Sequence, residues 1–428
     1  MMIKAFEKTC CQNADKLAFV CGKKEITYAR LQQDIYRAEN LLAAQGLSAG
    51  DKVLLFVLPS YAFYVLLFAC IRYGVNVVVM DSYRGFGRIR RVMRENKIAR
   101  VFCNNATAPL CGLLGKGVKR INISKYERYP NNPRQQHEVC DGLTVLTTFT
   151  SGTTGAPKSI HRTRNDLAEQ IKLVSDNVQI NATDVVWSNL PIYVLFVVYC
   201  GMTCVIDRRI SSRRLGMLGV TAVLASISAM LGMRKSAPGV QKLYFGGALL
   251  YPNQAAQLQS KFPNAKVGYV YGASECVLIA KGDIEHYLVH NNALETTVQG
   301  IRVWIKDADA YGVGRVCAQG RVVLTDDGTM VGSDLGYIDK YGLHIVGRAQ
   351  YSRMGCYNYL TDMRLLAENP KVKKGFSFIY NDKIWFCYQG RLSHKSADVQ
   401  YVRFLKIPMD AKHRTKPNYT RLISRIAK

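Results

Sequence analysis

Apolar positions in the first part of the chain predict two strands and a helix. Residues 17–20 and 24–27 have the short runs that are typical of strands, and from residue 28 to about residue 44 the apolar side chains recur at helical spacing. The pattern therefore predicts a pair of strands followed by an amphipathic helix.

The next stretch predicts a strand, a helix and a second strand in direct succession. Residues 52–58 are predicted to form a buried strand, residues 61–73 a helix and residues 75–80 another strand. When a helix connects two neighbouring strands, the second strand runs in the same direction as the first. Such units form a parallel sheet with helices on both faces. The predicted fold class is therefore α/β.

The same alternation continues along the chain, with glycine and proline at the breaks. Helices are predicted at residues 88–96 and 165–178, strands at 99–103, 185–190 and 243–245, and a β-hairpin around a turn at residues 340–342. Residues 126–138 are polar and carry proline, which predicts an exposed connector.

The composition is that of a globular protein. With 428 residues, 48% of them apolar, the chain can bury a large core, and its length predicts two or three domains. No uncharged apolar run reaches the roughly 18 residues of a transmembrane helix. Residues 1–19 have acidic and amide side chains where a signal peptide has an apolar centre, so the sequence predicts a cytoplasmic protein.

Cysteine and histidine spacing predicts neither a disulfide framework nor a metal site. The 13 cysteines form no C-x-x-C pair and are odd in number, which predicts reduced thiols. His286 and His290 are spaced as in a zinc helix, but no glutamate follows His286 as the motif H-E-x-x-H requires.

The charge of the chain predicts partners that are anionic. Its formal net charge of +27 attracts phosphates, acidic proteins, nucleic acids and anionic membranes. No RNA-binding or helix-turn-helix signature is present, so no specific nucleic acid partner is predicted. Peripheral contact with an anionic membrane stays open.

The densest group of polar residues follows the apolar run at residues 143–146. Its members are Thr150, Ser151, Gly152, Thr153, Thr154, Gly155 and Lys158. Glycine lets the backbone bend so that its N–H groups can approach an anion, and the lysine adds a mobile positive charge. The spacing is not that of a P-loop, because Pro157 precedes the lysine. The segment predicts a phosphate-binding loop, with a polar surface turn as the alternative.

Further segments carry groups that suit a nucleotide and a metal ion. In chain order they are Gly246-Gly247-Ala248, Tyr271-Gly272-Ala273-Ser274-Glu275, Asp334, Arg348 and Lys416. A carboxylate such as Glu275 suits a hard cation that it shares with phosphates. Taken singly, each segment has a structural alternative, namely a glycine turn, the end of a strand, a β-hairpin or one more cation in a basic tail.

Taken together and in this order, the segments resemble the signatures of the adenylate-forming enzymes. This AMP-binding superfamily includes the acyl-CoA synthetases, the luciferases and the adenylation domains of peptide synthetases, and the resemblance covers nearly the whole chain. It implies a large N-terminal domain at residues 1–347, made of mixed parallel sheets layered with helices. It also implies a small mobile α+β domain at residues 348–428, which swivels about Gln350 or Tyr351.

The resemblance also implies a role for each segment. Residues 150–158 would hold the β- and γ-phosphates of ATP, and Glu275 would hold Mg²⁺. Adenine would contact Gly246, Gly247, Ala248, Tyr271 and the Gly272 turn. Ser274 would bond the α-phosphate, and Asp334 would bond the ribose hydroxyls. Arg348 would reach the ribose or a phosphate. Lys416 falls on the catalytic lysine, which neutralises the charge that gathers as a carboxylate attacks the α-phosphorus.

The implied reaction is ATP-dependent adenylation of a carboxylic acid, which yields an acyl-AMP and pyrophosphate. Residues 193–199 are apolar and aromatic, which favours a fatty or aryl acid. The resemblance implies transfer of the acyl group to a thiol, either that of coenzyme A or the phosphopantetheine of an acyl carrier protein. An acidic carrier would suit the basic surface.

The chain departs from the family pattern at three places. Val194 stands where many relatives have histidine, Ser333 stands where glycine is usual, and residues 351–355 match the pantetheine loop poorly. Residues 201–207 and 410–416 are instead similar to the β-lactone synthetases of olefin biosynthesis. Two alternatives stay open: closure of a β-hydroxy acyl adenylate to a β-lactone, and a nucleotide- or polyanion-binding protein without catalysis.

Overall fold

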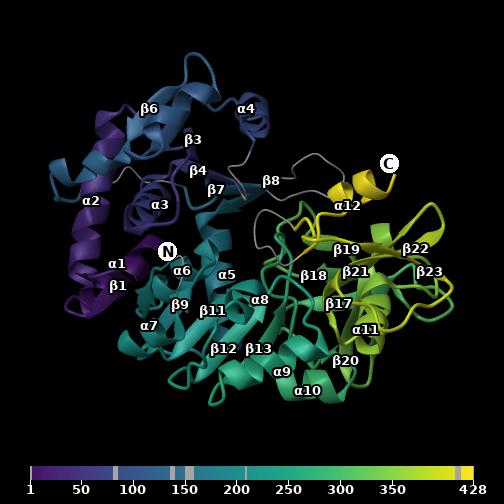
Figure 1. The fold of residues 1–428 in the computed structure, drawn as a ribbon. Helices are drawn as coiled ribbons and strands as arrows, with labels where there is room; N and C mark the ends of the chain where they lie inside the picture. Colours follow the sequence, from purple (N-terminus) through teal and green to yellow (C-terminus); the bar gives the residue numbers. More distant parts are fainter. Residues whose placement is uncertain are drawn as a thin grey trace. The chain divides into compact units, whose positions relative to one another are not determined.

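The computed structural model describes residues 2–80, 85–134, 140–149, 159–207, 210–409 and 416–427 (Figure 1). The chain divides into two compact units, Met1–Leu224 and Ala225–Lys428. The border that the sequence predicts between residues 347 and 348 is a different division, and it stays a prediction.

The first unit alternates helices and strands along its length. Its helices are α1 (Met2–Gln12), α2 (Tyr28–Ala44), α3 (Tyr61–Tyr73), α4 (Phe86–Glu95), α5 (Arg164–Asn177), α6 (Pro191–Tyr199) and α7 (Ser212–Met217), with the 3₁₀ helices η1 (Ala108–Leu114) and η2 (Ile123–Arg128). Its strands are β1 (Leu17–Cys21), β2 (Lys24–Thr27), β3 (Lys52–Leu55), β4 (Asn76–Met80), β5 (Arg100–Cys103), β6 (Lys119–Asn122), β7 (Thr144–Phe149), β8 (Ser159–Thr163), β9 (Val185–Ser188) and β10 (Thr203–Val205). Strand β11 (Ala222–Ser226) spans the border between the units.

Parallel strands dominate the first unit. One sheet has the order β6-β5-β3-β4-β7-β8 and is parallel except for the β7–β8 pair. In the other, the order is β11-β9-β10-β1-β2, and only β1 and β2 pair antiparallel. The parallel β3–β4 pair, which α3 connects, confirms the predicted strand–helix–strand unit and the α/β class.

Local signals explain why α3 begins and ends where it does. The side chain of Ser60 accepts a hydrogen bond from the backbone N–H of Phe63, which is the usual cap of a first turn. Gly74 ends the helix in the left-handed conformation, with φ of 87°. Between these residues nearly every side chain is buried, so the helix is held by packing on the adjoining sheet.

Three α-helices of the first unit, α1, α6 and α7, were not predicted from the sequence. Helix α1 buries Met2, Phe6 and Cys10, which recur at every fourth position but are too few for a clear periodic signal. Pro191 was predicted to stop a strand. The strand does end before it, at Ser188, and the proline then opens α6 at a helix position that needs no N–H donor.

The second unit begins with α/β elements and continues with antiparallel strands. Its helices are α8 (Ile227–Leu231), α9 (Pro252–Lys261), α10 (Ile284–Val289), η3 (Ala349–Tyr351), α11 (Asn358–Glu368) and α12 (Tyr419–Ile426). Its strands are β12 (Lys242–Gly246), β13 (Lys266–Tyr271), β14 (Ala280–Asp283), β15 (Ala293–Leu294), β16 (Thr296–Thr297), β17 (Arg302–Lys306), β18 (Gly314–Gln319), β19 (Thr329–Asp339), β20 (Gly342–Arg348), β21 (Val372–Tyr380), β22 (Lys383–Gly390) and β23 (Val399–Arg403).

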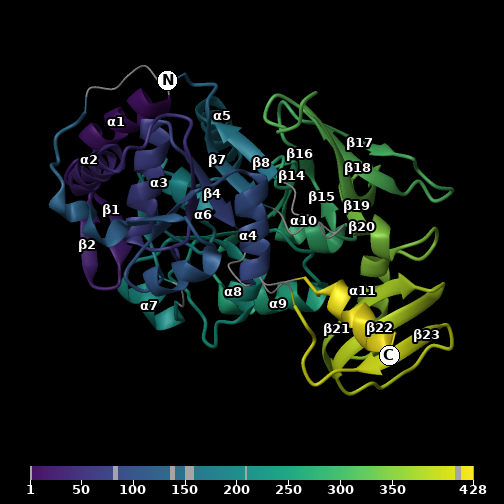
Figure 2. The same cartoon turned by 90° about the horizontal axis from the view of Figure 1, so that it is seen from above.

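Three groups of strands make up the second unit. Strands β12 and β13 are parallel, and β14 and β16 continue from β13 in antiparallel pairs. A separate sheet has the order β15-β20-β19-β18-β17, in which β19 and β20 form the predicted β-hairpin. The C-terminal sheet has the order β21-β22-β23, with α11 beside it (Figure 2). No helix in the described ranges is long and apolar enough to cross a membrane.

Aromatic side chains fill the core beneath the C-terminal sheet. Phe376 and Phe378 of β21 pack with Tyr419 and Leu422 of α12, and with Tyr251 before α9. The cluster joins residues from both sides of the predicted domain border, so the C-terminal elements share one apolar core with the start of α9.

A buried carboxylate lies at this junction. Asp362 of α11 is 0% exposed and accepts hydrogen bonds from the Tyr251 hydroxyl, at 2.6 Å, and from the backbone N–H of Ser377. Burial raises the pKa of Asp362 to about 7, although the bonds from Ser377 and Tyr251 act in the opposite direction. The protonated form of the side chain is therefore favoured in the folded chain at acidic pH.

This raised pKa predicts that Asp362 makes stability depend on pH. The unfolded carboxyl ionises near its ordinary value of 3.8, whereas the folded one keeps its proton until about pH 7. The free energy of unfolding should thus fall as pH rises through this window. Urea unfolding at pH 5 and pH 8 should show that Asp362→Asn removes about 2 to 3 kcal/mol of this fall.

A matched control for this measurement is Asp398→Asn, which alters an exposed carboxylate of the same unit. This variant should show the pH dependence of the unaltered chain, because it leaves the buried Asp362 carboxyl in place. An Asp362→Asn variant that also follows the unaltered chain between pH 5 and pH 8 would contradict the buried-carboxyl interpretation.

Candidate functional site

Two of the predicted segments meet at the carboxyl ends of β12 and β13. The strands are parallel, and Gly246 at the end of β12 is the register partner of Val270, one residue before Tyr271. The turn at residues 246–248 therefore leaves its strand beside the turn that begins at Tyr271. The carboxyl ends of parallel strands are where open α/β sheets bind their ligands.

Glycine is required at Gly246 because two backbones approach each other closely. A Cβ atom there would lie 2.4 Å from the carbonyl oxygen of Val270, and Gly247 has a φ of 81°. At Gly272 a Cβ atom would lie 2.3 Å from the carbonyl oxygen of Val277. The motif glycines thus bring the two turns together whatever ligand they hold.

Asp334 is held between a tyrosine and an arginine. The Tyr271 hydroxyl donates to Oδ2 of Asp334 at 3.1 Å, and Nε of Arg348 lies 2.8 Å from Oδ1. The hairpin sets the second contact, since Asp334 on β19 and Arg348 on β20 are register partners. Three of the predicted site residues are therefore brought together by three strands of the second unit, β13, β19 and β20.

Partial burial strengthens the Coulomb attraction within this ion pair. The side chains of Arg348 and Asp334 are 17% and 18% exposed. The Asp334 carboxylate raises the pKa of Arg348 above its ordinary value, so the guanidinium stays charged. Burial, and then the same carboxylate, raise the pKa of Tyr271 well above its ordinary value, which keeps the phenol a neutral donor.

Two further side chains contact the Arg348 guanidinium, and the sequence alone assigned neither of them to the site. Nη1 of Arg348 donates to Oγ of Ser333 at 2.9 Å, and Nε lies 3.4 Å from the Tyr359 hydroxyl. Ser333 stands where the family pattern has glycine, and here its hydroxyl gives the arginine an additional acceptor. Burial raises the pKa of Tyr359 to about 12. No sequence signal marked Tyr359, because it lies between the Arg348 and Lys416 segments, where no family motif is matched.

Ser274 and Glu275 lie in a compact turn after β13. The backbone N–H of Ala273 donates to the carbonyl of Cys276 at 2.7 Å, and that of Leu324 donates to the carbonyl of Glu275 at 2.9 Å. The Glu275 side chain is half-buried. The turn therefore has a fixed backbone at the same edge of the sheet as Tyr271.

Lys416 lies in the second unit, directly before α12. It is half-buried, and the following residues tie its segment to the chain before it. Pro417 forms an isolated β-bridge with Met409, and the backbone N–H of Asn418 donates to the carbonyl of Pro408 at 2.8 Å. These two contacts hold the backbone in place directly after Lys416.

The predicted phosphate loop, residues 150–158, lies outside the described residues. The strands at its two ends are described, and they pair with each other at Phe149 and Ser159. The Arg162 guanidinium supports this hairpin, since Nη1 donates to the Thr148 hydroxyl at 2.8 Å and Nε donates to Gln170 at 3.1 Å. The described strand ends on either side of this segment are therefore paired with each other.

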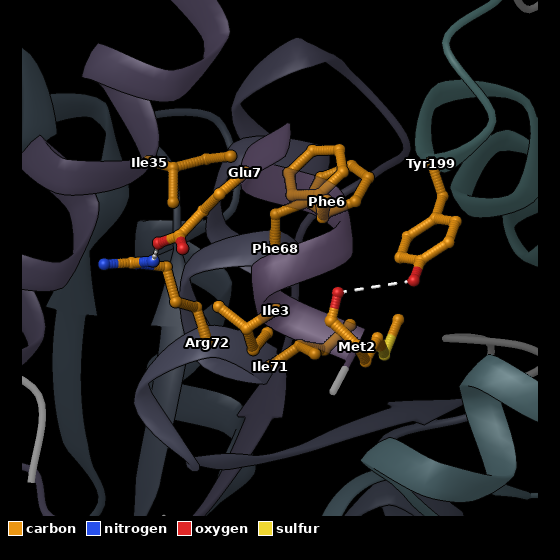
Figure 3. Close-up of a pocket in the computed structure, with 9 residues that line it drawn as sticks. All are labelled: Met2, Ile3, Phe6, Glu7, Ile35, Phe68, Ile71, Arg72 and Tyr199. Atoms are coloured by element: carbon orange, nitrogen blue, oxygen red, sulfur yellow. Dashed lines mark hydrogen bonds and ion pairs between the residues drawn. The ribbon is translucent and has the colours of Figure 1, made fainter. Parts of the chain in front are cut away.

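A small cavity in the first unit is a separate feature (Figure 3). It lies among α1, α2, α3 and α6, and Figure 3 shows Glu7 and Arg72 paired at one side of it. The stacked rings of Phe6 and Phe68, 4.7 Å apart, form another wall. The space of about 20 Å³ would hold about one water molecule, which is too little for an acyl chain.

Comparison with known proteins identifies the family. Residues 6–332 match the family model described as AMP-binding enzyme. The chain belongs to the AMP-binding enzyme family. This confirms the resemblance that the ordered segments indicated.

Curated relatives of this AMP-binding protein match it in part. The D-alanine--D-alanyl carrier protein ligase of Bacillus cereus (strain G9842) is 22% identical over 66% of this chain and 60% of the relative. The fatty acid--[acyl-carrier-protein] ligase ScoC of Streptomyces coeruleorubidus is 22% identical over 60% of this chain and 55% of the relative. Pseudomonine synthase PmsE of Pseudomonas entomophila is 28% identical over 40% of this chain and 31% of the relative. The matched part thus spans less than two thirds of each relative.

Solved structures share the fold along nearly the whole chain. O-succinylbenzoate coenzyme A synthetase (MenE) of Bacillus subtilis, in complex with AMP, superposes with a TM-score of 0.83 at 16% identity and covers 97% of both chains. ATP-bound MatB of Rhodopseudomonas palustris gives a TM-score of 0.84 at 16% identity, with 98% of both chains covered. The α/β fold with mixed parallel sheets and a small C-terminal β domain is therefore confirmed.

The close approach at Gly246 predicts that this AMP-binding protein does not tolerate a larger residue there. Gly246→Ala should lower the free energy of unfolding by about 2 kcal/mol or more, because β12 and β13 must separate to admit the methyl group. Urea unfolding would measure this loss. Gly239→Ala, at an exposed glycine where a Cβ atom meets nothing within 4 Å, should change stability by less than about 0.5 kcal/mol. Equal effects of the two changes would contradict the argument.

Proposed function

We propose that this chain activates a carboxylic acid by adenylation, in which the carboxylate attacks the α-phosphorus of ATP to give an acyl-AMP and pyrophosphate. The observation that carries the proposal is the Asp334 carboxylate, held by Tyr271 and Arg348 beside the ends of two parallel strands. A carboxylate has about four lone-pair sites, and these two contacts use about two of them. Asp334 can thus accept further hydrogen bonds from the two hydroxyls of a ribose.

Aromatic and glycine residues beside Asp334 suit a purine base. Tyr271 is fixed through its hydroxyl, so its ring is held in one orientation. The glycine turn at residues 246–248 brings backbone close to it, and Tyr269 secures this turn by donating to the carbonyl of Ala248 at 3.1 Å. An adenine between a flat ring and a bare backbone would be recognised by its shape and its polar edge. We assign adenine contact to Gly246, Gly247, Ala248, Tyr271 and Gly272.

We assign the phosphates and the reacting centre to the remaining segments. Residues 150–158 would hold the β- and γ-phosphates, Ser274 would bond the α-phosphate, and Lys416 would neutralise charge at the attacking carboxylate. Positioned charge of this kind is worth most where water is excluded. The catalytic roles of Lys416 and Arg348 are therefore electrostatic.

Magnesium would be held by Glu275 together with ATP. Within the described ranges, no group of three or more histidine, cysteine or acidic residues could hold a metal ion by itself. A site with one protein carboxylate, substrate phosphates and water is the usual arrangement for Mg²⁺. There the ion would neutralise phosphate charge. A solved structure of MenE with ATP and magnesium ion supports this assignment by fold.

Pyrophosphate exchange into ATP, dependent on an added carboxylic acid, tests the proposal. Lys416→Ala should lower the exchange rate about 100-fold to 1,000-fold because it removes positioned charge from the reacting centre. ATP binding should change little. Lys406→Ala, which removes an exposed lysine of the same basic tail, is the matched control and should exchange like the unaltered chain. A chain that binds ATP but exchanges no pyrophosphate with a broad acid panel would favour the non-catalytic alternative.

We propose a fatty or aryl acid as the substrate. Helix α6 is apolar and aromatic throughout, and Val194 is fully buried, so no charged partner for an amino acid stands on this helix. The relatives named above act on D-alanine and on fatty acids, which shows how widely acyl specificity varies in the family. The acid panel should therefore include both classes, with short amino acids as the comparison.

We propose a thiol as the acyl acceptor, either coenzyme A or an acidic acyl carrier protein. Helix α4 supports the carrier, because Ile89, Val92 and Met93 are buried while Arg90, Arg91 and Arg94 are exposed. A row of exposed arginines would attract an acidic partner. The domain division at residues 347 and 348, the hinge at Gln350 or Tyr351 and the cytoplasmic location are further parts of this proposal.

Incubation with a 3-hydroxy fatty acid and Mg·ATP distinguishes the thiol acceptor from β-lactone closure. Without thiol, we expect acyl-AMP to be the product, and with coenzyme A or a carrier protein we expect a thioester and AMP. Mass spectrometry identifies each product. The same fatty acid without its 3-hydroxyl is the control, since it cannot close a lactone. A β-lactone formed without thiol, from the hydroxylated acid alone, would replace the thiol proposal with the alternative.

A further inference from the structure

Asn358, the first residue of α11, is buried, and both the oxygen and the nitrogen of its side chain form hydrogen bonds. It is 2% exposed. Its Oδ1 accepts hydrogen bonds from the backbone N–H of Arg348 at 2.8 Å and from the Ser352 hydroxyl at 3.0 Å. Its Nδ2 donates to the Tyr419 hydroxyl at 3.1 Å. A buried carboxamide with its donor and acceptor both satisfied specifies one geometry for the groups around it.

The two ends of the Asn358 side chain contact two segments of the chain, and each segment carries a candidate catalytic cation, Arg348 or Lys416. At one end, Arg348 follows Gly347, where a Cβ atom would lie 2.6 Å from the Ser352 hydroxyl oxygen and 3.1 Å from Oδ1 of Asn358. Glycine is thus needed there to admit the carboxamide. At the other end, Tyr419 lies three positions after Lys416 and opens α12. One side chain therefore ties the chain at Arg348 to the chain after Lys416.

The Tyr419 ring is held firmly enough to fix the position of the Lys416 segment. It is 8% exposed, and its ring stacks on Tyr351 at 3.8 Å between centroids and meets Phe378 edge-on at 5.5 Å. Stacking fixes the plane of the ring, and the bond from Asn358 fixes its direction within that plane. Only two residues, Pro417 and Asn418, separate this anchor from Lys416, so the backbone of the lysine has few ways to move independently.

We propose that Asn358 is a positioning residue that aligns Arg348 and the Lys416 segment on the same nucleotide. The inference rests on the proposed adenylation function and adds a residue that touches neither substrate nor reacting atoms. A carboxamide suits the site because it accepts from Arg348 and donates to Tyr419 at once. Leucine has neither group, and an ionised aspartate has no donor.

The test separates the two ends of the link. Tyr419→Phe removes the bond from Asn358 but keeps the buried ring and its stack on Tyr351. We expect kcat for pyrophosphate exchange to fall about tenfold and the KM for ATP to stay within about twofold, since only the Lys416 segment loses its alignment. Asn358→Ala removes both ends, so we expect it to lower kcat and also raise the KM for ATP through Arg348.

Tyr287→Phe is the matched control. Tyr287 is 1% exposed and donates to the carbonyl of Leu250 at 3.0 Å, so its change removes one buried phenol hydrogen bond from the same unit. We expect similar losses of thermal stability in Tyr419→Phe and Tyr287→Phe, but a lower kcat only in the former. Equal kcat values in these two variants would overturn the proposal.

Chemical labelling gives a second readout that needs no turnover. An amine-reactive acetylating reagent is applied with and without Mg·ATP, and acetylation of Lys416 and Lys406 is followed by mass spectrometry. We expect Mg·ATP to protect Lys416 in the unaltered chain and in Tyr287→Phe, but not in Tyr419→Phe or Asn358→Ala. Lys406 should be labelled equally throughout.

The two readouts distinguish failure of the inference from failure of the proposed function. Protection of Lys416 that Tyr419→Phe abolishes, in a chain that exchanges no pyrophosphate, would support the positioning role and refute adenylation. Exchange and protection that both survive in Tyr419→Phe and Asn358→Ala would refute the positioning role and leave adenylation standing. An unaltered chain in which Mg·ATP protects no lysine would refute both.

Discussion

The ion pair between Asp334 and Arg348 is the constraint on which the candidate site depends. It joins neighbouring strands of a hairpin, and the Tyr271 hydroxyl attaches it to the end of another sheet. Side chains alternate between the faces of a strand, so a register slip of one residue would turn Asp334 away from both partners. The register shift between Leu335 and Gly336 lies directly after Asp334, as expected where a bulge directs a side chain toward a functional position.

Three glycines, two of which the family motifs assign to ligand contact, have a packing role of their own in this chain. Gly246, Gly272 and Gly347 each lie where a Cβ atom would be within 2.6 Å of another atom. Close backbone approach brings the ends of β12 and β13 together and admits Asn358 beside Arg348. Close packing and ligand contact can therefore depend on the same glycines, because both a neighbouring strand and a flat base can approach a backbone that has no side chain.

How far the sequence predicted the structure depends on how local each signal is. Helices α2 and α3 were predicted with the bounds that the structure has, because their apolar spacing and end residues lie within a few positions. Helices α1, α6 and α7 of the same unit were missed. The site segments were recognised singly, but the pairing of Asp334 with Arg348 depends on strand register. Tyr359 and Asn358 carried no signal, because the distant residues they contact decide their roles.

The departures from the family pattern have different physical meanings in the structure. Ser333 adds an acceptor for Arg348, whereas Tyr351 is buried and stacked on Tyr419, next to the predicted hinge. Tyr351 and Tyr419 both follow Gln350, so rotation of the C-terminal elements about Gln350 would carry this stack along unbroken. It would, however, separate the Tyr251 hydroxyl from the buried Asp362 carboxyl, which lie on opposite sides of the predicted domain border. Such a rotation needs a gain in free energy that offsets the loss of the buried contacts. A ligand can supply this free energy only by binding the rotated form more tightly. If the chain does swivel between two steps, the acyl-adenylate or the acceptor must therefore supply the difference in binding energy.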